Sequence, residues 1–349
     1  MNAALSVHHG GLHTTVQDRG RYGLQAIGVP VSGALDAVAL HVANVLVGNA
    51  PGCAALEILG TGPVLEVNAE SVRLAIAGAN ASLEVLAPNR RALSCFESFR
   101  LQRGEIFRVG ALSDGAVTYL AVEGGLDLPI LLGSRSTYTR AAFGGFQGRA
   151  ITTDDDLPLV LQGVLERKES RLRGRALPGQ LPIRIIPGPQ DDFFTSDALE
   201  TLLTNEYTVS PAVDRMGMRL DGPRLEHARG FNITSDGTAP GSIQVPGDGL
   251  PIVLLADRQT TGGYPKIGCV ISADFATIAR LRQGDTVSFV LASLDEAGRA
   301  RIEQDRWLSA LSSRIESIAP SGIIDTTALT TENLISGVVG IDEPSGQGN

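Results

Sequence analysis

Short apolar stretches alternate with turn residues through the first half of the chain. Turn-forming segments such as GTGP at 60–63 and APN at 87–89 separate apolar stretches at 64–67, 72–77, 83–86, 106–109 and 117–122. A second series of this kind starts with 183–186 and continues to about residue 291. Short strands at this spacing favour an antiparallel barrel or sandwich. We therefore expect a mainly β protein with a few short helices.

Three segments carry a helical pattern instead. In the first, residues 35–46 form an apolar face, with Ser32 as the N-cap candidate, Asp36 in the first turn and Gly48 as the stop signal. The second is expected at 196–204, where three leucines share one face. The third, 295–318, spaces its apolar residues at three- and four-residue steps, at Leu308, Leu311, Ile315 and Ile318.

The charged, apolar-poor segment 165–180 ends in Pro178 and Gly179 and is the best candidate linker. It divides the chain into a predicted N-terminal domain (1–175), a C-terminal domain (181–293) and a helical or extended tail (294–349). The tail either packs on its own barrel or forms a docking arm for a partner subunit. A short apolar strip at 334–341 precedes a terminus, 343–349, that is expected to be disordered.

Length and charge narrow the class of protein. A chain of 349 residues is long for one core, so two domains are expected. A net charge of −9 argues against nucleic acid as a partner, and no apolar run is long enough to span a bilayer. Three distant cysteines with no metal-ligand spacing predict neither a zinc site nor a disulfide framework. The cytoplasm is the expected location.

The segment 254–268, LLADRQTTGGYPKIG, is the richest in candidate chemistry. An apolar run opens into two adjacent glycines, which let backbone N–H groups approach a ligand closely. A glutamine, two threonines and a lysine add donors within the same short span. The alternative is a glycine-rich turn followed by a solvated lysine.

Five other segments carry polar clusters. TTVQDRGRYG at 14–23, with GVPVSGALD at 28–36, sets arginines among glycines next to a predicted helix start, and the alternative is a turn with solvated arginines. The segment 124–149 places arginines and hydroxyls in one patch, which suits an anionic or amide ligand. The alternative is an ordered loop whose side chains bond to its own backbone. The other three are 185–194, 210–220, where Asp214 and Arg215 suggest a local ion pair, and 235–249, where Gln244 offers an amide or a cross-strand hydrogen bond.

Taken in order from residue 14 to residue 268, these motifs resemble the biotin-dependent carboxyltransferase family, which is also called allophanate hydrolase subunit 2 and includes the 5-oxoprolinase C subunit and KipA-like proteins. The resemblance rests on runs such as GGLDLPILLGSRSTY, SDGTAPGSIQVP and ADRQTTGGYPKIG, and covers about four-fifths of the chain. It implies two cyclophilin-like β-barrel domains and a cleft that is shared with a companion subunit. That companion is of the allophanate hydrolase subunit 1 type, which corresponds to the 5-oxoprolinase B subunit.

Members of this family divide over function. The favoured hypothesis is a 5-oxoprolinase C subunit that opens the cyclic amide 5-oxoproline to glutamate together with a lactam-utilising hydrolase subunit. ATP is then used by the complex, because this chain has no P-loop. The alternatives are a carboxyltransferase that moves CO2 from carboxybiotin, on a separate carrier subunit, to a urea or amide nitrogen, and a regulator that antagonises a kinase inhibitor. The chain has no biotinyl-lysine motif and no amidase segment.

The same motifs give a set of candidate site residues. Arg19, Arg21 and Arg135 are expected to hold a carboxylate, and Gln244 and Gln259 to orient a planar amide. The catalytic set combines hydroxyls and a positive charge that stabilise a developing oxyanion: Lys266, Gln259, Thr260 and Thr261. The remaining binding candidates are Ser134, Ser136, Tyr138, Gln190, Gly262, Gly263 and Tyr264. No metal is expected in this site.

Overall fold

Two sheets and one helix build the first half of the chain in the computed structural model, which describes residues 3–179 and 181–318. The six-stranded antiparallel sheet runs β11 (Asp156–Pro158), β1 (Ala4–His9), β4 (Val64–Val67), β9 (Ile106–Leu112), β6 (Ala81–Ala87), β7 (Arg91–Leu93). The five-stranded antiparallel sheet runs β2 (His13–Gln17), β3 (Ala55–Leu59), β10 (Val117–Val122), β5 (Ser71–Gly78), β8 (Ser98–Gln102). Helix α1 (Ala37–Val47) packs on β5 and β10. Strand β10 is therefore buried along its whole length.

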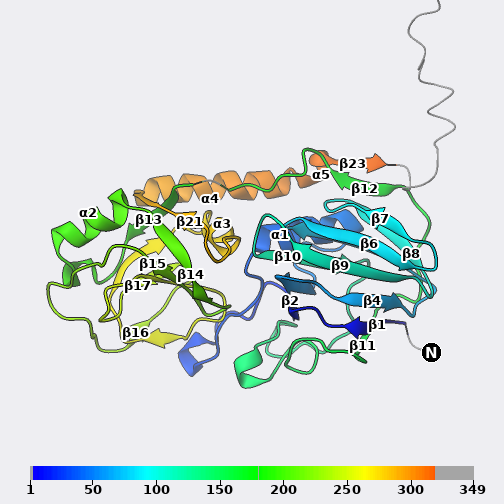
Figure 1. Cartoon of the computed structure of the whole chain (residues 1–349), viewed down its shortest axis with the longest axis horizontal. Coiled ribbons are helices and arrows are strands. Elements are labelled where there is room, and N and C mark those ends of the chain that lie inside the picture. Colours follow the sequence, from blue (N-terminus) through cyan, green and yellow to red (C-terminus); the bar gives the residue numbers. More distant parts are fainter. Residues whose placement is uncertain (1–2, 180, 319–349) are drawn as a thin grey trace, which may run out of the picture.

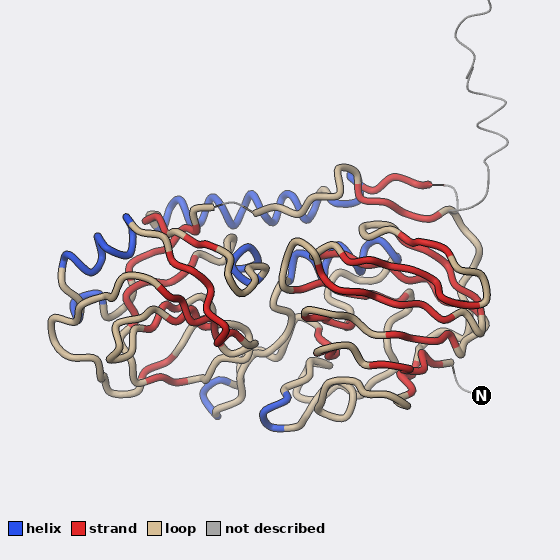
Figure 2. The backbone as a smooth tube through the Cα atoms, in the orientation of Figure 1, coloured by secondary structure: helices blue, strands red, loops and turns tan. Residues whose placement is uncertain are grey.

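A single eight-stranded sheet forms most of the second half. Its order is β21 (Thr286–Val287), β14 (Tyr207–Val213), β15 (Gly217–Asp221), β18 (Ile252–Leu254), β17 (Ser242–Gln244), β20 (Lys266–Val270), β13 (Ile183–Pro187), β22 (Phe289–Leu291). A two-stranded ribbon of β16 (Asp236–Gly237) and β19 (Thr261–Gly262) lies beside it. The helices of this half are α2 (Ser196–Thr204) and α3 (Phe275–Ala279). The mainly β, barrel-type fold with few helices is confirmed (Figure 2).

The two halves have separate hydrophobic cores, one built on β3, β5, β10 and α1 and the other on β13, β15, β17 and β18. Three single-turn 3-10 helices lie in the loops of the described residues: η1 (Gln25–Ile27), η2 (Thr139–Ala141) and η3 (Asp191–Phe193). In Figure 1 they include the short blue helix (η1) and the short green helix (η2) at the lower edge of the molecule, between the two halves. The domain boundaries expected from the sequence stay a prediction.

Residues 294–318 run from the second half back to the first along one side of the molecule (Figure 1). Helix α4 (Leu294–Ser309) begins in a capping box of Ser293 and Glu296 and buries Ala300 against the second half. Helix α5 (Leu311–Arg314) then inserts Leu311 into the core of the first half. Residues 294–318 thus pack on their own chain, the first of the two interpretations of the tail. The apolar strip at 334–341 and the terminus at 343–349 lie outside the described residues.

Three local predictions were wrong. Asp36, not Ser32, caps α1, because its Oδ1 accepts from the N–H groups of Val38 (3.0 Å) and Ala39 (2.9 Å), whereas Ser32 has a positive φ of 53°. The third helical pattern ends at Arg314, because residues 315–318 form β23 (Ile315–Ile318). This strand pairs with β12 (Glu169–Leu172), so the expected linker 165–180 contains a strand.

Candidate functional site

One face of the eight-stranded sheet carries buried polar side chains in place of an apolar core. Ile243 and Ile267 point into the hydrophobic core, so alternation places Gln244 and Lys266 on the opposite face. A register shift between Ile243 and Gln244 pairs Gln244 with Lys266 across β17 and β20. Both side chains are only 2% exposed. The strands thus hold an amide and an ammonium side by side, away from bulk water.

These two groups lack hydrogen-bond partners among the described residues. Gln244 Nε2 and Lys266 Nζ have none there, although buried polar atoms in native proteins nearly always do. Lys266 Nζ lies 3.5 Å from Asp236 Oδ2, an ion-pair distance. Gln190 links the same groups, because its Oε1 accepts from the Lys266 backbone N–H (3.3 Å) and its Nε2 donates to Asp236 Oδ2 (3.2 Å). Leaving a buried donor unpaired is costly, so these donors are suited to a ligand.

The segment 257–262 covers this polar face. A Cβ placed on Gly262 would lie 2.4 Å from Gln244 Nε2 and 3.1 Å from Gln259 Nε2, so the two amides meet at this glycine. The Thr238 backbone N–H donates to Thr260 O (3.1 Å), and the Thr238 hydroxyl donates to Gln259 O. Gln259, Thr261 and Tyr264 are exposed. Gly263 O accepts from the Ile233 N–H (2.9 Å).

The arginine and serine motifs of the first half meet around Asp18. Asp18 accepts from the Ser134 and Ser136 hydroxyls (2.6 Å each), from the Arg135 N–H (2.6 Å) and from the Gly20 N–H (2.8 Å). Burial raises the pKa of Asp18, but the serine hydrogen bonds outweigh it and hold the pKa below its ordinary value. Ser134 and Ser136 thus have an internal partner in the structure, which fixes the two loops together.

The three arginines expected to hold a carboxylate make different contacts in the structure. Arg135 Nε donates to Leu128 O (2.7 Å), and Arg19 is exposed and lies against Gly52. Arg21 alone of the three is buried, at 1% exposure, with its guanidinium carbon 4.7 Å from the centre of the Phe143 ring. Tyr138 packs edge-on against the same ring, with centroids 5.7 Å apart.

The loop that contains Arg21 reaches the second half. Gln25 Nε2 donates to Thr238 O at 3.5 Å, next to the polar face of the sheet. A buried ion-pair network fixes this approach: Arg215 donates to Asp257 (2.8 and 3.0 Å), to Glu57 and to Gly33 O. The local ion pair expected between Asp214 and Arg215 was therefore wrong.

Sequence analysis did not single out Glu57, Asp257 and Tyr119 as network residues. Glu57 is fully buried on β3 and accepts from the Leu35 N–H (2.9 Å) and from the Tyr119 hydroxyl. In the sequence, the one indication of this buried network was a charged residue, Glu57, inside the apolar stretch 55–59. Burial and the nearby carboxylates raise the pKa of Tyr119 well above its ordinary value, so its hydroxyl stays a donor.

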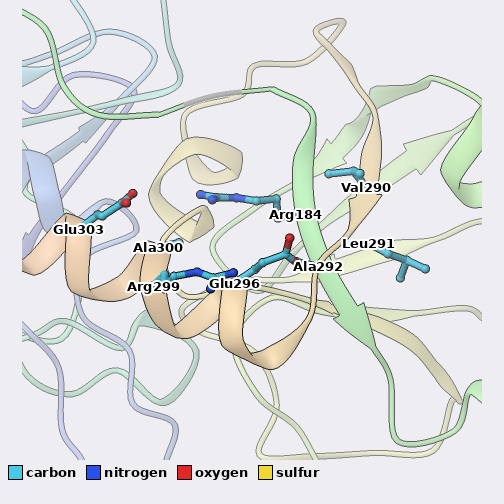
Figure 3. A pocket seen from close by; sticks show the side chains of 8 residues that line it. All are labelled: Arg184, Val290, Leu291, Ala292, Glu296, Arg299, Ala300 and Glu303. Atoms are coloured by element: carbon cyan, nitrogen blue, oxygen red, sulfur yellow. The ribbon is translucent and has the colours of Figure 1, made fainter.

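A surface pocket lies elsewhere on the molecule. It has a volume of about 330 Å³ and is bounded by α4 and β22, with Arg184, Leu291, Glu296 and Arg299 among its lining residues (Figure 3). None of the candidate site residues lines it. Within residues 3–179 and 181–318, no three His, Cys, Asp or Glu side chains are grouped to hold a metal ion, and no helix has both the length and the apolar character that crossing a membrane requires.

Each half of the protein is built from β-sheet, and a buried polar face on the second half is approached by a loop from the first. These features define a mainly β protein with two barrel-type halves. Residues 27–291 match the family described as carboxyltransferase domain, subdomain A and B. The chain belongs to this biotin-dependent carboxyltransferase family.

Named relatives fall into two groups. The chain is 36% identical over 317 residues to the 5-oxoprolinase C subunit of Escherichia coli, covering 90% of this chain and 99% of that protein. It is 30% identical over 335 residues to urea amidolyase of Saccharomyces cerevisiae, covering 88% of this chain but 18% of that protein. The crystal structure of K. lactis urea amidolyase superposes with a TM-score of 0.82 at 29% identity, over 93% of this chain and 20% of that one. Both groups are enzymes or enzyme subunits, which supports an enzymatic role.

Proposed function

We propose that this chain is part of an ATP-dependent 5-oxoprolinase and that its buried polar face binds the cyclic amide of 5-oxoproline. One observation carries the proposal: Gln244 Nε2 and Lys266 Nζ are adjacent, buried donors without hydrogen-bond partners among the described residues. A planar amide oxygen accepts hydrogen bonds from such groups. The similarity to the 5-oxoprolinase C subunit over 99% of that protein's length favours this substrate.

The chain's own residues would bind and orient the lactam. Gln244 and Gln259 meet at Gly262 and would fix the plane of the amide. Lys266 would stabilise negative charge that develops on the lactam oxygen, in a site from which water is largely excluded. Gln190 and Asp236 would hold Lys266 in place through the contacts described above. ATP is expected on another subunit, and no step of this chain depends on it.

Carboxyl transfer from carboxybiotin to a urea or amide nitrogen is the second candidate. The match to the carboxyltransferase family and the likeness to urea amidolyase favour it. The same donors fit a ureido oxygen, so biotin on a separate carrier subunit is compatible with this face. A third candidate, a regulator that binds a companion subunit and antagonises a kinase inhibitor, needs no such buried donors.

The proposed partners are a companion of the 5-oxoprolinase B subunit type and a lactam-utilising hydrolase subunit. The relative from Escherichia coli is named as one subunit of its enzyme, which supports a multi-subunit assembly. The cytoplasm is the proposed location.

Reconstitution tests the proposal. The chain is mixed with its companion and hydrolase subunits, ATP and 5-oxoproline, and glutamate is measured with and without ¹⁴C-bicarbonate. The proposal predicts glutamate formation that needs this chain and incorporates no label. Label incorporation into urea or an amide, dependent on a biotinylated carrier, would establish carboxyl transfer instead.

A further inference from the structure

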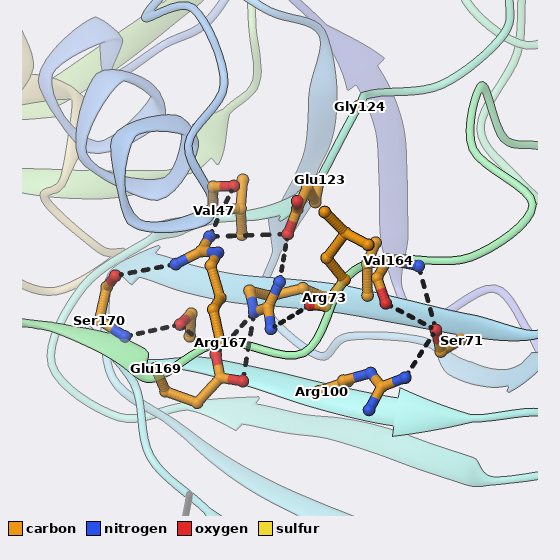
Figure 4. Close-up of polar contacts among 12 residues, drawn as sticks. Val47, Ser71, Arg73, Arg100, Glu123, Gly124, Val164, Arg167, Glu169 and Ser170 are labelled. Carbon is orange, nitrogen blue, oxygen red and sulfur yellow. Dashed lines mark hydrogen bonds and ion pairs between the residues drawn. The ribbon is translucent and has the colours of Figure 1, made fainter. Parts of the chain in front are cut away.

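Four arginines are buried in the part of the chain that the structure describes, and they differ in how their charge is balanced. Arg73 is fully buried and pairs with Glu169 (3.0 Å) and Glu123 (Figure 4). Arg215, at 5% exposure, pairs with Asp257 and Glu57. Their carboxylates outweigh burial and raise the pKa of both guanidinium groups above the ordinary value. These two arginines show how this fold compensates a buried positive charge.

Arg21 makes no ion pair with a carboxylate within the described residues, although the charges of Asp18 and Asp257 act on it from a greater distance. Its Nη2 donates to the Ser136 carbonyl, whereas Nε and Nη1 are buried there without any hydrogen-bond partner. The Phe143 ring contributes a cation–π contact, which is weaker than an ion pair. Burial lowers the pKa of Arg21 below its ordinary value, which is the reverse of what Arg73 and Arg215 show.

Arg258 likewise makes no ion pair with a carboxylate among the described residues. It is 3% exposed, and its hydrogen bonds to other described residues are long ones to backbone carbonyls, from Nε to Thr238 O (3.4 Å) and from Nη1 to Leu255 O (3.4 Å). Burial lowers the pKa of Arg258 as well. Arg258 lies directly before Gln259 in the segment that covers the polar face of the sheet.

The two arginines come from opposite halves, and the segments that carry them meet at Thr238. Arg258 Nε and Gln25 Nε2 donate to the same carbonyl, Thr238 O, and Gln25 is four residues beyond Arg21 on one loop. Asp257, which precedes Arg258 in the chain, raises the pKa of Arg21, and Tyr22, which follows Arg21, raises the pKa of Arg258, although burial lowers both more strongly. A buried guanidinium without an anion is unfavourable, and its planar fork matches a carboxylate.

We propose that Arg21 and Arg258 form a binding site for the carboxylate of the substrate, across the junction of the two halves and beside the amide-binding face. The proposal rests on the proposed function in that it names a small carboxylate-bearing amide as the ligand. Urea, which has no carboxylate, would not use this site. Arg258 is then a binding residue that determines specificity.

Thermal unfolding of the full chain tests the site without any substrate. Removing an uncompensated buried charge should not destabilise the fold, so R258Q should melt within about 2 °C of wild type, whereas R215Q, which leaves two buried carboxylates, should lose more than about 5 °C. Acetate, the carboxylate alone, should raise the melting temperature of wild type above that in chloride of equal ionic strength, and should not do so for R21Q or R258Q. A loss of stability in R258Q equal to that in R215Q, or no effect of acetate on wild type, would overturn the site.

Substrate selectivity is then measured in the reconstituted complex without biotin. R258Q should raise the KM for 5-oxoproline about 10- to 100-fold, because this is the loss of affinity expected when hydrogen bonds to a charged group are removed. It should change the binding of 2-pyrrolidinone, the same lactam without a carboxylate, less than about 3-fold. R301Q, on the exposed face of α4, is the matched control and should alter neither. Equal losses for both lactams would make Arg258 structural and refute the proposal.

The two proposals fail in different ways. If wild type does not turn over 5-oxoproline but acetate still stabilises it through Arg21 and Arg258, the proposed function fails and the carboxylate site stands. If 5-oxoproline is opened and R258Q has the wild-type KM, the function stands and the site is wrong.

Discussion

Replacing Gly262 by alanine should reduce activity while the fold is kept. Gly262 lies where the amides of Gln244 and Gln259 meet, and an added Cβ would be 2.4 Å from Gln244 Nε2 and 3.1 Å from Gln259 Nε2. Ordinary contact begins at 3.4 Å, so the Gln244 amide has to move by about 1 Å. Such a displacement of a substrate-positioning group costs on the order of 10² in turnover.

The cost to stability should be small. The atoms that Gly262→Ala displaces are the ends of flexible side chains, so we expect the variant to lose about 1 kcal/mol, the low end for overpacking. The assay is glutamate formation from 5-oxoproline by the complex, together with a thermal melt of the chain. Far-UV circular dichroism confirms that the β content is unchanged.

The neighbouring glycine is a matched control. A Cβ on Gly263 would have only Ile233 O at 3.7 Å and Ser235 Oγ at 3.8 Å near it among the described residues, which is ordinary contact. Gly263→Ala should therefore keep activity within a factor of about 3 of wild type. Equal activity in the two variants, or equal loss, would refute the assignment of the Gln244 and Gln259 amides to substrate binding.

Three further predictions concern charged groups. Lys266→Met should reduce turnover by about 10²–10³ and leave the melting temperature unchanged or higher, because the variant removes a buried ammonium whose ion pair, at 3.5 Å, is with the exposed Asp236; a large loss of stability would contradict this. Glu57→Gln should lower the free energy of unfolding by about 3–5 kcal/mol in a urea titration, since it leaves Arg215 short of a carboxylate; a loss below about 1 kcal/mol would contradict the role of the network. The pKa of Asp18 in the folded protein is below its ordinary value of 3.8. Its contribution to stability is therefore fully present when the pH is above the ordinary pKa, and is lost as the pH falls through the folded-state pKa. The difference in urea midpoint between wild type and Asp18→Asn should accordingly shrink between about pH 6 and about pH 3, and a constant difference would contradict the pKa direction.

The hydrophobic pattern predicted the bounds of those elements in which the spacing of apolar residues matches the buried positions. Strands β4 and β10 and helix α2 have the expected bounds, because each is an apolar run or an apolar face closed by turn residues. The pattern did not predict secondary structure that depends on pairing with a distant strand. Residues 315–318 continue a helical spacing, yet they form a strand because β12, which lies far earlier in the chain, pairs Leu172 with Ile315 and Glu169 with Ile318.

The candidate site, too, was only partly predictable from the sequence. Gln244 and Lys266 lie together because a register shift between β17 and β20 places them on one face, and spacing alone does not reveal a shift. The partners of Ser134, Ser136 and Arg135 became visible only when Asp18 was located beside them. Whether an arginine binds substrate or balances an internal carboxylate depends on contacts across the halves, so the sequence could not separate Arg215 from Arg258.

A crystal structure of the chain with 5-oxoproline tests the central claim most directly. The account predicts the lactam oxygen within hydrogen-bond distance of Gln244 Nε2 or Lys266 Nζ, with the lactam plane beside Gly262. Binding of 5-oxoproline in the pocket between α4 and β22, next to Arg184, with no ligand atom near Gln244 or Lys266, would contradict it.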